Sequence, residues 1–179
     1  LNYCLMKAKV DYIIRLDADD IAEPHRIKTQ MDFIEKYNYD VVGSNLIYIN
    51  ENNKKIGQKK YPEHNKEIRK NIYYTNTLAH PSVMYKKSVM LTNNGYLNGK
   101  VSEDYDLWLR LMRDKNIKFY NIQEPLLKYR IHASQSKGDK LAYCEVAGHM
   151  TREFLFTGSF KYFLGIFVYI LKFIINKKN

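Results

Sequence analysis

A short apolar segment places the strongest constraint on the fold of this chain. Residues 10–16 (VDYIIRL) form a run rich in β-branched side chains, which is typical of a short buried strand. The run stops at Asp17-Ala18-Asp19-Asp20, and three carboxylates in four residues cannot continue a buried strand. We therefore expect a sheet in which this strand ends at an edge and delivers acidic side chains there.

The rest of the chain alternates between strand-like and helix-like segments. Further strands are expected at 40–50, 81–85, 117–122 and 125–129, and helices at 2–9, from Pro24 to about residue 34, and at 63–73, 103–113, 140–156 and 160–175. This alternation indicates an α/β layered fold. A chain of 179 residues can bury a core without disulfides or bound metals. Its two cysteines, Cys4 and Cys144, suit a reducing compartment.

The charge of the chain points to an anionic partner. The formal net charge is +10, with seven basic residues against two acidic ones between Lys54 and Lys70. A nucleic acid is not expected, because lysine dominates over arginine and no nucleic-acid-binding module is present. The anionic partners that remain as candidates are a phosphorylated ligand and an acidic membrane surface.

The acidic segment itself is a candidate ligand site. Asp17 and Asp19 offer hard oxygen ligands without a nearby cysteine, which suits Mg²⁺ or Mn²⁺ better than zinc. Ligands in open α/β sheets also tend to bind at the carboxyl ends of the strands. The alternative is an acidic loop whose charge caps the following helix through its dipole.

Two later segments carry further candidate residues. Asp104 shares a helical face with Leu107 and Trp108 while Glu103 is expected to point away, so Asp104 is either a helix cap or a base facing a cleft. After a predicted strand, Arg130 and His132 could neutralise a diphosphate. For His132, and equally for His80, the alternative is a hydrogen-bonded structural histidine.

In this order the segments resemble glycosyltransferase family 2. The matching stretches are YIIRLDADD at 12–20, then Pro24, Arg26, Gln30 and Phe33, VGS at 42–44, HPSVM at 80–84, EDYDLWLR at 103–110 and YRIH at 129–132. The resemblance implies a GT-A fold, a nucleotide-sugar donor, a divalent cation (Mn²⁺ or Mg²⁺) and a glycan or lipid-linked acceptor.

The resemblance also implies roles for individual residues. Asp17 and Asp19 match the DXD carboxylates that hold the metal on the donor diphosphate, and Asp104 matches the general base of inverting members. The remaining candidates for donor or acceptor binding, besides Asp17, are Glu103, Arg130, His132 and His80.

The match begins just before the DXD strand. The family pattern has an upstream strand and a DDGS segment that hold the nucleoside, and neither is present. We therefore expect residues 1–136 to be the C-terminal portion of a mixed-sheet GT-A domain lacking its N-terminal nucleotide-binding part, followed by a helical region at 137–179. The rival interpretations are an inactive remnant that binds membrane or a partner, and a nucleotidyltransferase of related fold.

The C-terminal segment 160–175 is apolar at thirteen of its sixteen positions. Its uninterrupted apolar run of ten residues is too short to span a bilayer. Helical spacing places Lys161, Gly165 and Lys172 on one stripe, which favours a helix lying on an anionic membrane. The expected location is cytoplasmic and peripheral, on the inner face of the membrane; packing on the chain's own core or on a partner is the alternative.

Overall fold

A mixed sheet passes through the centre of the computed structural model, which describes residues 1–97, 99–132 and 140–176. Its strands are β1 (Tyr12–Ile14), β2 (Ile21–Ala22), β3 (Val41–Ile49), β4 (Lys55–Lys59), β5 (Met84–Lys86) and β6 (Phe119–Arg130). The helices are α1 (Asn2–Lys7), α2 (Arg26–Tyr37), α3 (Asn65–Asn71), α4 (Lys87–Thr92), α5 (Glu103–Leu111), α6 (Lys140–Thr157) and α7 (Phe160–Ile175). A 3₁₀ turn covers His80–Ser82.

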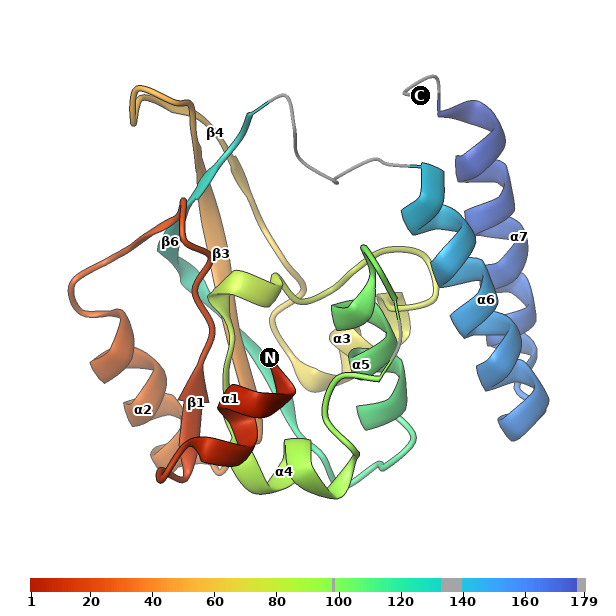
Figure 1. Ribbon diagram of the computed structural model, residues 1–179, viewed down its shortest axis with the longest axis horizontal. Helices are drawn as coiled ribbons and strands as arrows, with labels where there is room; N and C mark the ends of the chain where they lie inside the picture. Colours follow the sequence, from red (N-terminus) through yellow and green to blue (C-terminus); the bar gives the residue numbers. More distant parts are fainter. Residues whose placement is uncertain (98, 133–139, 177–179) are drawn as a thin grey trace.

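The sheet has the order β1-β5-β3-β6-β2, with β4 pairing with β3. β3 and β6 are parallel, and the other pairs are antiparallel. Helix α2 covers one face, while α3, α5, α6 and α7 lie on the other side (Figure 1). The predicted mixed α/β fold is confirmed.

Strand β6 differs from the prediction of two short strands at 117–122 and 125–129. It is one strand of twelve residues with an irregular middle, where its register against β3 shifts on both sides of Asn45. Pro125 lacks an N–H for the ladder, and the Asn45 side chain compensates by donating to the Gln123 carbonyl at 2.6 Å. The break between the two predicted strands is thus a bulge within a single strand.

The main hydrophobic cluster surrounds Trp108, which is fully buried in α5. Tyr162 and Tyr169 of α7 belong to the same cluster, so the C-terminal helix packs on the core through one face. Gly165 lies between them on that face, and a Cβ there would come within 3.0 Å of the Tyr73 carbonyl oxygen. This close approach requires glycine.

The lysine stripe of α7 therefore has a different environment from the one predicted. Gly165 and half-buried Lys172 face the rest of the protein, while Lys161 stays exposed at the start of the helix. The solvent-facing side of α7 is apolar instead. The middle of the stripe thus lies on the packed face of α7 and not on its solvent-facing side.

Candidate active site

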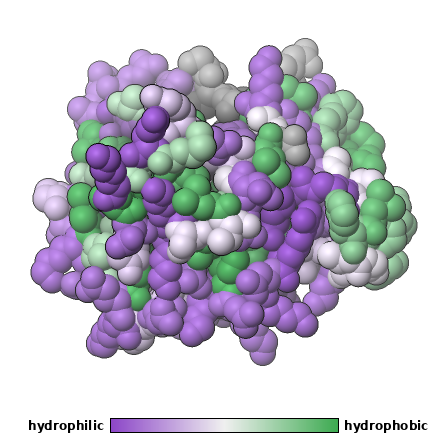
Figure 2. Space-filling view, turned by 60° about the horizontal axis from the view of Figure 1, so that its bottom comes forward, coloured by the Kyte–Doolittle hydropathy of each residue, from purple (hydrophilic) through white to green (hydrophobic). Residues whose placement is uncertain are grey.

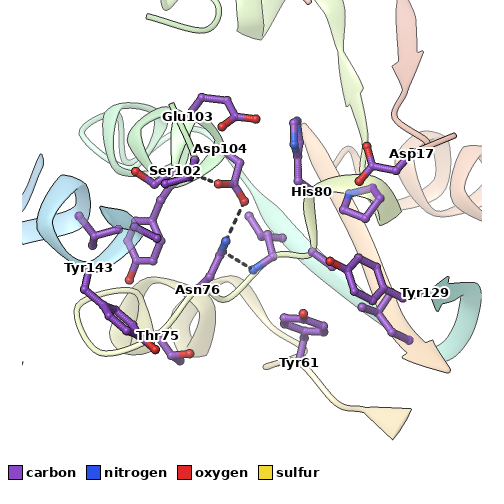
Figure 3. Close-up of a pocket in the computed structure, with 18 of the residues that line it drawn as sticks. Asp17, Tyr61, Thr75, Asn76, His80, Ser102, Glu103, Asp104, Tyr129 and Tyr143 are labelled. Carbon is purple, nitrogen blue, oxygen red and sulfur yellow. Dashed lines mark hydrogen bonds between the residues drawn. The ribbon is translucent and has the colours of Figure 1, made fainter. Parts of the chain in front are cut away.

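A cavity of about 560 Å³ opens at the carboxyl ends of the parallel strands β3 and β6. Its walls come from the segment after β1, the 3₁₀ turn, the loop before it, the start of α5, and helices α6 and α7. Figure 3 shows Asp104 lying between Asp17 on one side and Thr75 and Tyr143 on the other. Open α/β sheets tend to bind ligands at the carboxyl ends of their strands, as at this cavity.

Asp104 lies in the first turn of α5 with its carboxylate toward the cavity. Its Oδ2 accepts a hydrogen bond from Asn76 Nδ2 at 2.8 Å, and its Oδ1 accepts one from the backbone N–H of Tyr105 at 2.8 Å (Figure 3). Burial nevertheless raises the pKa of Asp104 to about 6. A carboxylate with this pKa is deprotonated at neutral pH and is a stronger base than an exposed aspartate.

Glu103 also lines the cavity, although the helical pattern predicted that it would point away. The reason is the position of both residues in the first turn, where the end of α5 opens toward the cavity. From Tyr105 to Leu111 the helix is buried all round, so its later residues have no solvent-exposed face.

Glu145 of α6 holds the loop that leads into α5. Its carboxylate accepts hydrogen bonds from the backbone N–H groups of Lys100 (2.8 Å) and Val101 (3.1 Å) and from the Ser102 hydroxyl (2.7 Å). Burial raises the pKa of Glu145, but these hydrogen bonds outweigh it and lower the pKa below its usual range. The start of the Asp104 helix is thus positioned by a residue that no sequence motif indicated.

Tyr105, the residue after Asp104, is held in place by a contact with helix α7. The buried Tyr105 hydroxyl donates to the Ile72 carbonyl and accepts a hydrogen bond from the Tyr169 hydroxyl at 2.6 Å. Helix α7 therefore supports the catalytic candidate as well as lining the cavity.

The three carboxylates of the acidic segment have separate environments. Asp17 lines the cavity and forms an ion pair with Arg15, whereas Asp19 is exposed, with its Oδ2 3.2 Å from His132 Nε2. Asp20 is buried, which raises its pKa to about 6, and it accepts the backbone N–H of Arg130 at 2.9 Å. None of them is the N-cap residue of α2, which is His25.

The donor set at Asp17 and Asp19 suits a cation that is shared with a ligand. Across the described ranges, no three His, Cys, Asp or Glu side chains form a ready-made metal site. Mg²⁺ and Mn²⁺ are commonly held by one or two carboxylates together with substrate phosphates. The two carboxylates therefore fit a cation bound with a diphosphate, with His132 beside Asp19.

His80 and Arg130 are both engaged in the fold. His80 reaches the cavity, but its Nε2 lies 2.8 Å from the Tyr96 hydroxyl, and burial, with a contribution from Arg15, lowers its pKa to about 3. It is therefore neutral at physiological pH. The Arg130 guanidinium donates to the carbonyls of Asp19 and Asn50. It ties the acidic loop to the hairpin of β3 and β4.

Comparison with known proteins agrees with this geometry. Residues 1–90, half of the chain, match the family described as Glycosyl transferase family 2. The O-antigen biosynthesis glycosyltransferase WbnJ of Escherichia coli is 41% identical over 177 residues, which cover 98% of this chain and 69% of WbnJ. The chain belongs to glycosyltransferase family 2. Of the two enzyme classes considered, glycosyltransferase is confirmed over nucleotidyltransferase.

Two other matching proteins are longer than this chain. An E. coli UDP-Gal:alpha-D-GlcNAc-diphosphoundecaprenol beta-1,3-galactosyltransferase is 33% identical over 153 residues, covering 82% of this chain and 54% of that protein. The crystal structure of S. aureus TarS 1-349 has a TM-score of 0.65 at 16% identity, covering 99% of this chain and 51% of that chain. The chain thus spans about half the length of these two proteins, and the TarS match confirms the fold.

Proposed function

We propose that this glycosyltransferase is metal-dependent and inverting, and that it transfers a sugar from a nucleotide-sugar to a glycan or lipid-linked acceptor in surface polysaccharide synthesis. The observation that carries the proposal is one cavity that holds both the Asp104 carboxylate and the Asp17 carboxylate (Figure 3). The names of the relatives support the substrates, since they refer to O-antigen and to a UDP-sugar. A TarS structure in complex with UDP-GlcNAc has the same fold.

In this mechanism Asp104 acts as the general base. An acceptor hydroxyl beside Asp104 loses its proton to the carboxylate while its oxygen attacks the anomeric carbon of the donor sugar. The bond between that carbon and the diphosphate breaks on the opposite face, so the configuration inverts and a nucleoside diphosphate leaves. The burial that raises the pKa of Asp104 favours this proton transfer.

Asp17 and Asp19 would hold the divalent cation together with the donor diphosphate. A cation bound there supplies positive charge to the leaving diphosphate. Arg130 and His132 act on this site indirectly, because both contact Asp19.

Replacing Asp19 with asparagine should reduce Mn²⁺-dependent transfer by the full-length protein at least tenfold, because a neutral amide is a weaker ligand for a hard cation. The matched control is Asp32→Asn, which also removes an exposed aspartate but one that lies on α2. It should retain wild-type activity. Titration of Mn²⁺ in the presence of the nucleotide-sugar gives a second readout. Wild-type Mn²⁺ affinity and activity in Asp19→Asn would show that the metal assignment is wrong.

We also propose that α7 binds an anionic membrane surface, which would place the protein peripherally on the cytoplasmic face. Along its exposed side lie five large apolar residues at helical spacing: Phe160, Leu164, Phe167, Leu171 and Ile174. Figure 2 shows an apolar patch at the right edge of the molecule, where α6 and α7 lie. No helix among residues 1–97, 99–132 and 140–176 combines the length and the apolar content that crossing a bilayer requires.

The excess of basic residues supports this surface as a membrane contact. The formal net charge of +10 attracts the chain to anionic lipids, and exposed Lys161 borders the apolar face. Lys177 and Lys178 follow α7 in the sequence and lie outside the described residues. Deleting α7 is not a clean test, because Tyr162 and Tyr169 would leave the core.

Point substitutions on the exposed side of α7 avoid this problem. Phe167 and Leu171 are 50% and 54% exposed, and Phe167 also packs against Phe163 of the same helix, so changing both to serine should lower the melting temperature by only a few degrees. Binding to anionic vesicles should fall at least tenfold, because each side chain contributes about 1 kcal/mol of apolar burial in the membrane. The matched control changes Ile27 and Ile56, also exposed, to serine. Equal vesicle binding by the two double variants in co-sedimentation would contradict the proposal.

A further inference from the structure

The cavity has opposite charges at its two ends. Asp17, Glu103 and Asp104 contribute three carboxylates on the side of β1 and α5, where exposed Lys100 is the one basic lining residue, whereas Lys172 of α7 lines the other side without an acidic neighbour among the described residues of the wall. In Figure 1, β1 and α7 lie on opposite sides of the molecule. The acidic end suits a cation with the donor diphosphate, and a second anionic group would be repelled there unless it too bound a cation.

Lys172 is half-buried and lacks a carboxylate partner among the residues described. Its Nζ donates to the Tyr74 carbonyl and lies 4.5 Å from the centre of the Tyr169 ring. An ammonium group has three N–H donors, so donors remain for a ligand. Burial lowers the pKa of Lys172, and repulsion from nearby Lys59 lowers it further. A half-buried cation near a second cation is stabilised by an anionic ligand.

The surroundings of Lys172 indicate what this ligand carries. On the same helix, Leu171 and Ile175 belong to the exposed apolar surface. On the cavity side, Tyr143 and Tyr61 line the same cavity as Lys172 and add aromatic rings to its wall. Aromatic walls with a few polar groups are suited to the body of a ligand. A ligand that joins a sugar, a phosphate and an apolar chain has one part for each of these environments.

We propose that Lys172 and the adjacent face of α7 form a subsite for an acceptor in which the sugar is linked through phosphate to a lipid. The sugar would lie against the aromatic wall with its accepting hydroxyl at Asp104. The phosphate on its anomeric carbon would lie at Lys172, and the lipid would follow α7 into the membrane. This proposal rests on the proposed function, because it assumes that Asp104 marks the acceptor hydroxyl.

The test compares two acceptors in detergent micelles, which exclude anionic lipid from the assay. One is a sugar linked by diphosphate to a prenyl chain, and the other is the same sugar as a neutral alkyl glycoside. Lys172→Gln should raise the KM for the diphosphate acceptor at least tenfold and change the KM for the neutral glycoside less than twofold, with kcat similar for both. Lys172→Arg should retain most of the wild-type behaviour, and Lys70→Gln on α3 controls for net charge.

A binding measurement separates failure of this subsite from failure of the proposed function. Farnesyl diphosphate is titrated into the wild-type protein and into Lys172→Gln, with farnesol and inorganic diphosphate as the lipid and phosphate components alone. We expect Lys172→Gln to weaken farnesyl diphosphate binding at least tenfold and to leave farnesol unaffected, whether or not sugar is transferred. An equal change for both acceptors, or unchanged binding of farnesyl diphosphate, would overturn the subsite.

Discussion

Replacing Asp104 with asparagine should lower kcat for sugar transfer at least a hundredfold while the protein remains folded. The amide keeps the size of the side chain and can still accept the Tyr105 N–H, but it cannot take a proton from the acceptor. Contributions of a positioned general base are typically 10²-fold to 10⁴-fold. The measurements are kcat in the full-length protein and the melting temperature of the variant.

The neighbouring carboxylate provides the matched comparison. Glu103 lines the same cavity, so Glu103→Gln removes one negative charge from the same place without removing the assigned base. Its effect should be much smaller, within about tenfold. If Asp104→Asn unfolds the protein and a stabilised version regains activity, Asp104 is a helix cap and not a base.

The pH profile provides a further check on Asp104. Burial raises its pKa to about 6, and the Asn76 hydrogen bond opposes part of that rise. A general base works in its deprotonated form, and kcat/KM reports the pKa of the free enzyme, so log(kcat/KM) should be flat above pH 6 and fall with a slope of about one below it. In Asp104→Asn the residual rate should lose this acid limb.

The predictions of helices and strands were most accurate where the sequence pattern lies within one short segment. The last helix was expected at 160–175 and is observed from Phe160 to Ile175, because Gly158 and Ser159 interrupt an otherwise apolar segment. Strand β3 is equally clear, since Val41–Leu46 and Ile49 are buried within it. The acidic residue at the end of the first strand, Asp17, does reach the cavity.

What the sequence could not predict depends on contacts between distant segments. Asn76 and Glu145 carry no motif, and their roles become visible only when the chain brings them to the start of α5. Strand β4 is exposed and rich in lysine, so it shows no apolar alternation, and its pairing with β3 defines it. The orientation of the stripe through Lys172 likewise depends on which face of α7 packs on the core.

Replacing Asp106 with asparagine should destabilise the protein by about 3–5 kcal/mol, which is a large part of a typical folding free energy. Asp106 lies two residues after Asp104 but is 0% exposed. It pairs with Arg110 Nε at 2.8 Å and with Arg152, and His149 Nδ1 lies 3.9 Å away. A neutral amide would leave the buried Arg110 charge without its carboxylate, and an uncompensated buried charge is the costly outcome.

A surface pair with the same helical spacing isolates the effect of burial. Lys28 and Asp32 are also four residues apart on a helix and lie 2.7 Å from each other, but both are exposed. Asp32→Asn should therefore cost about 0–1 kcal/mol. In thermal melts, Asp106→Asn should lower the melting temperature by roughly 6–20 °C, and Asp32→Asn by a few degrees at most. Similar small shifts for both variants would mean that Asp106 is not the counter-charge on which this part of the core depends.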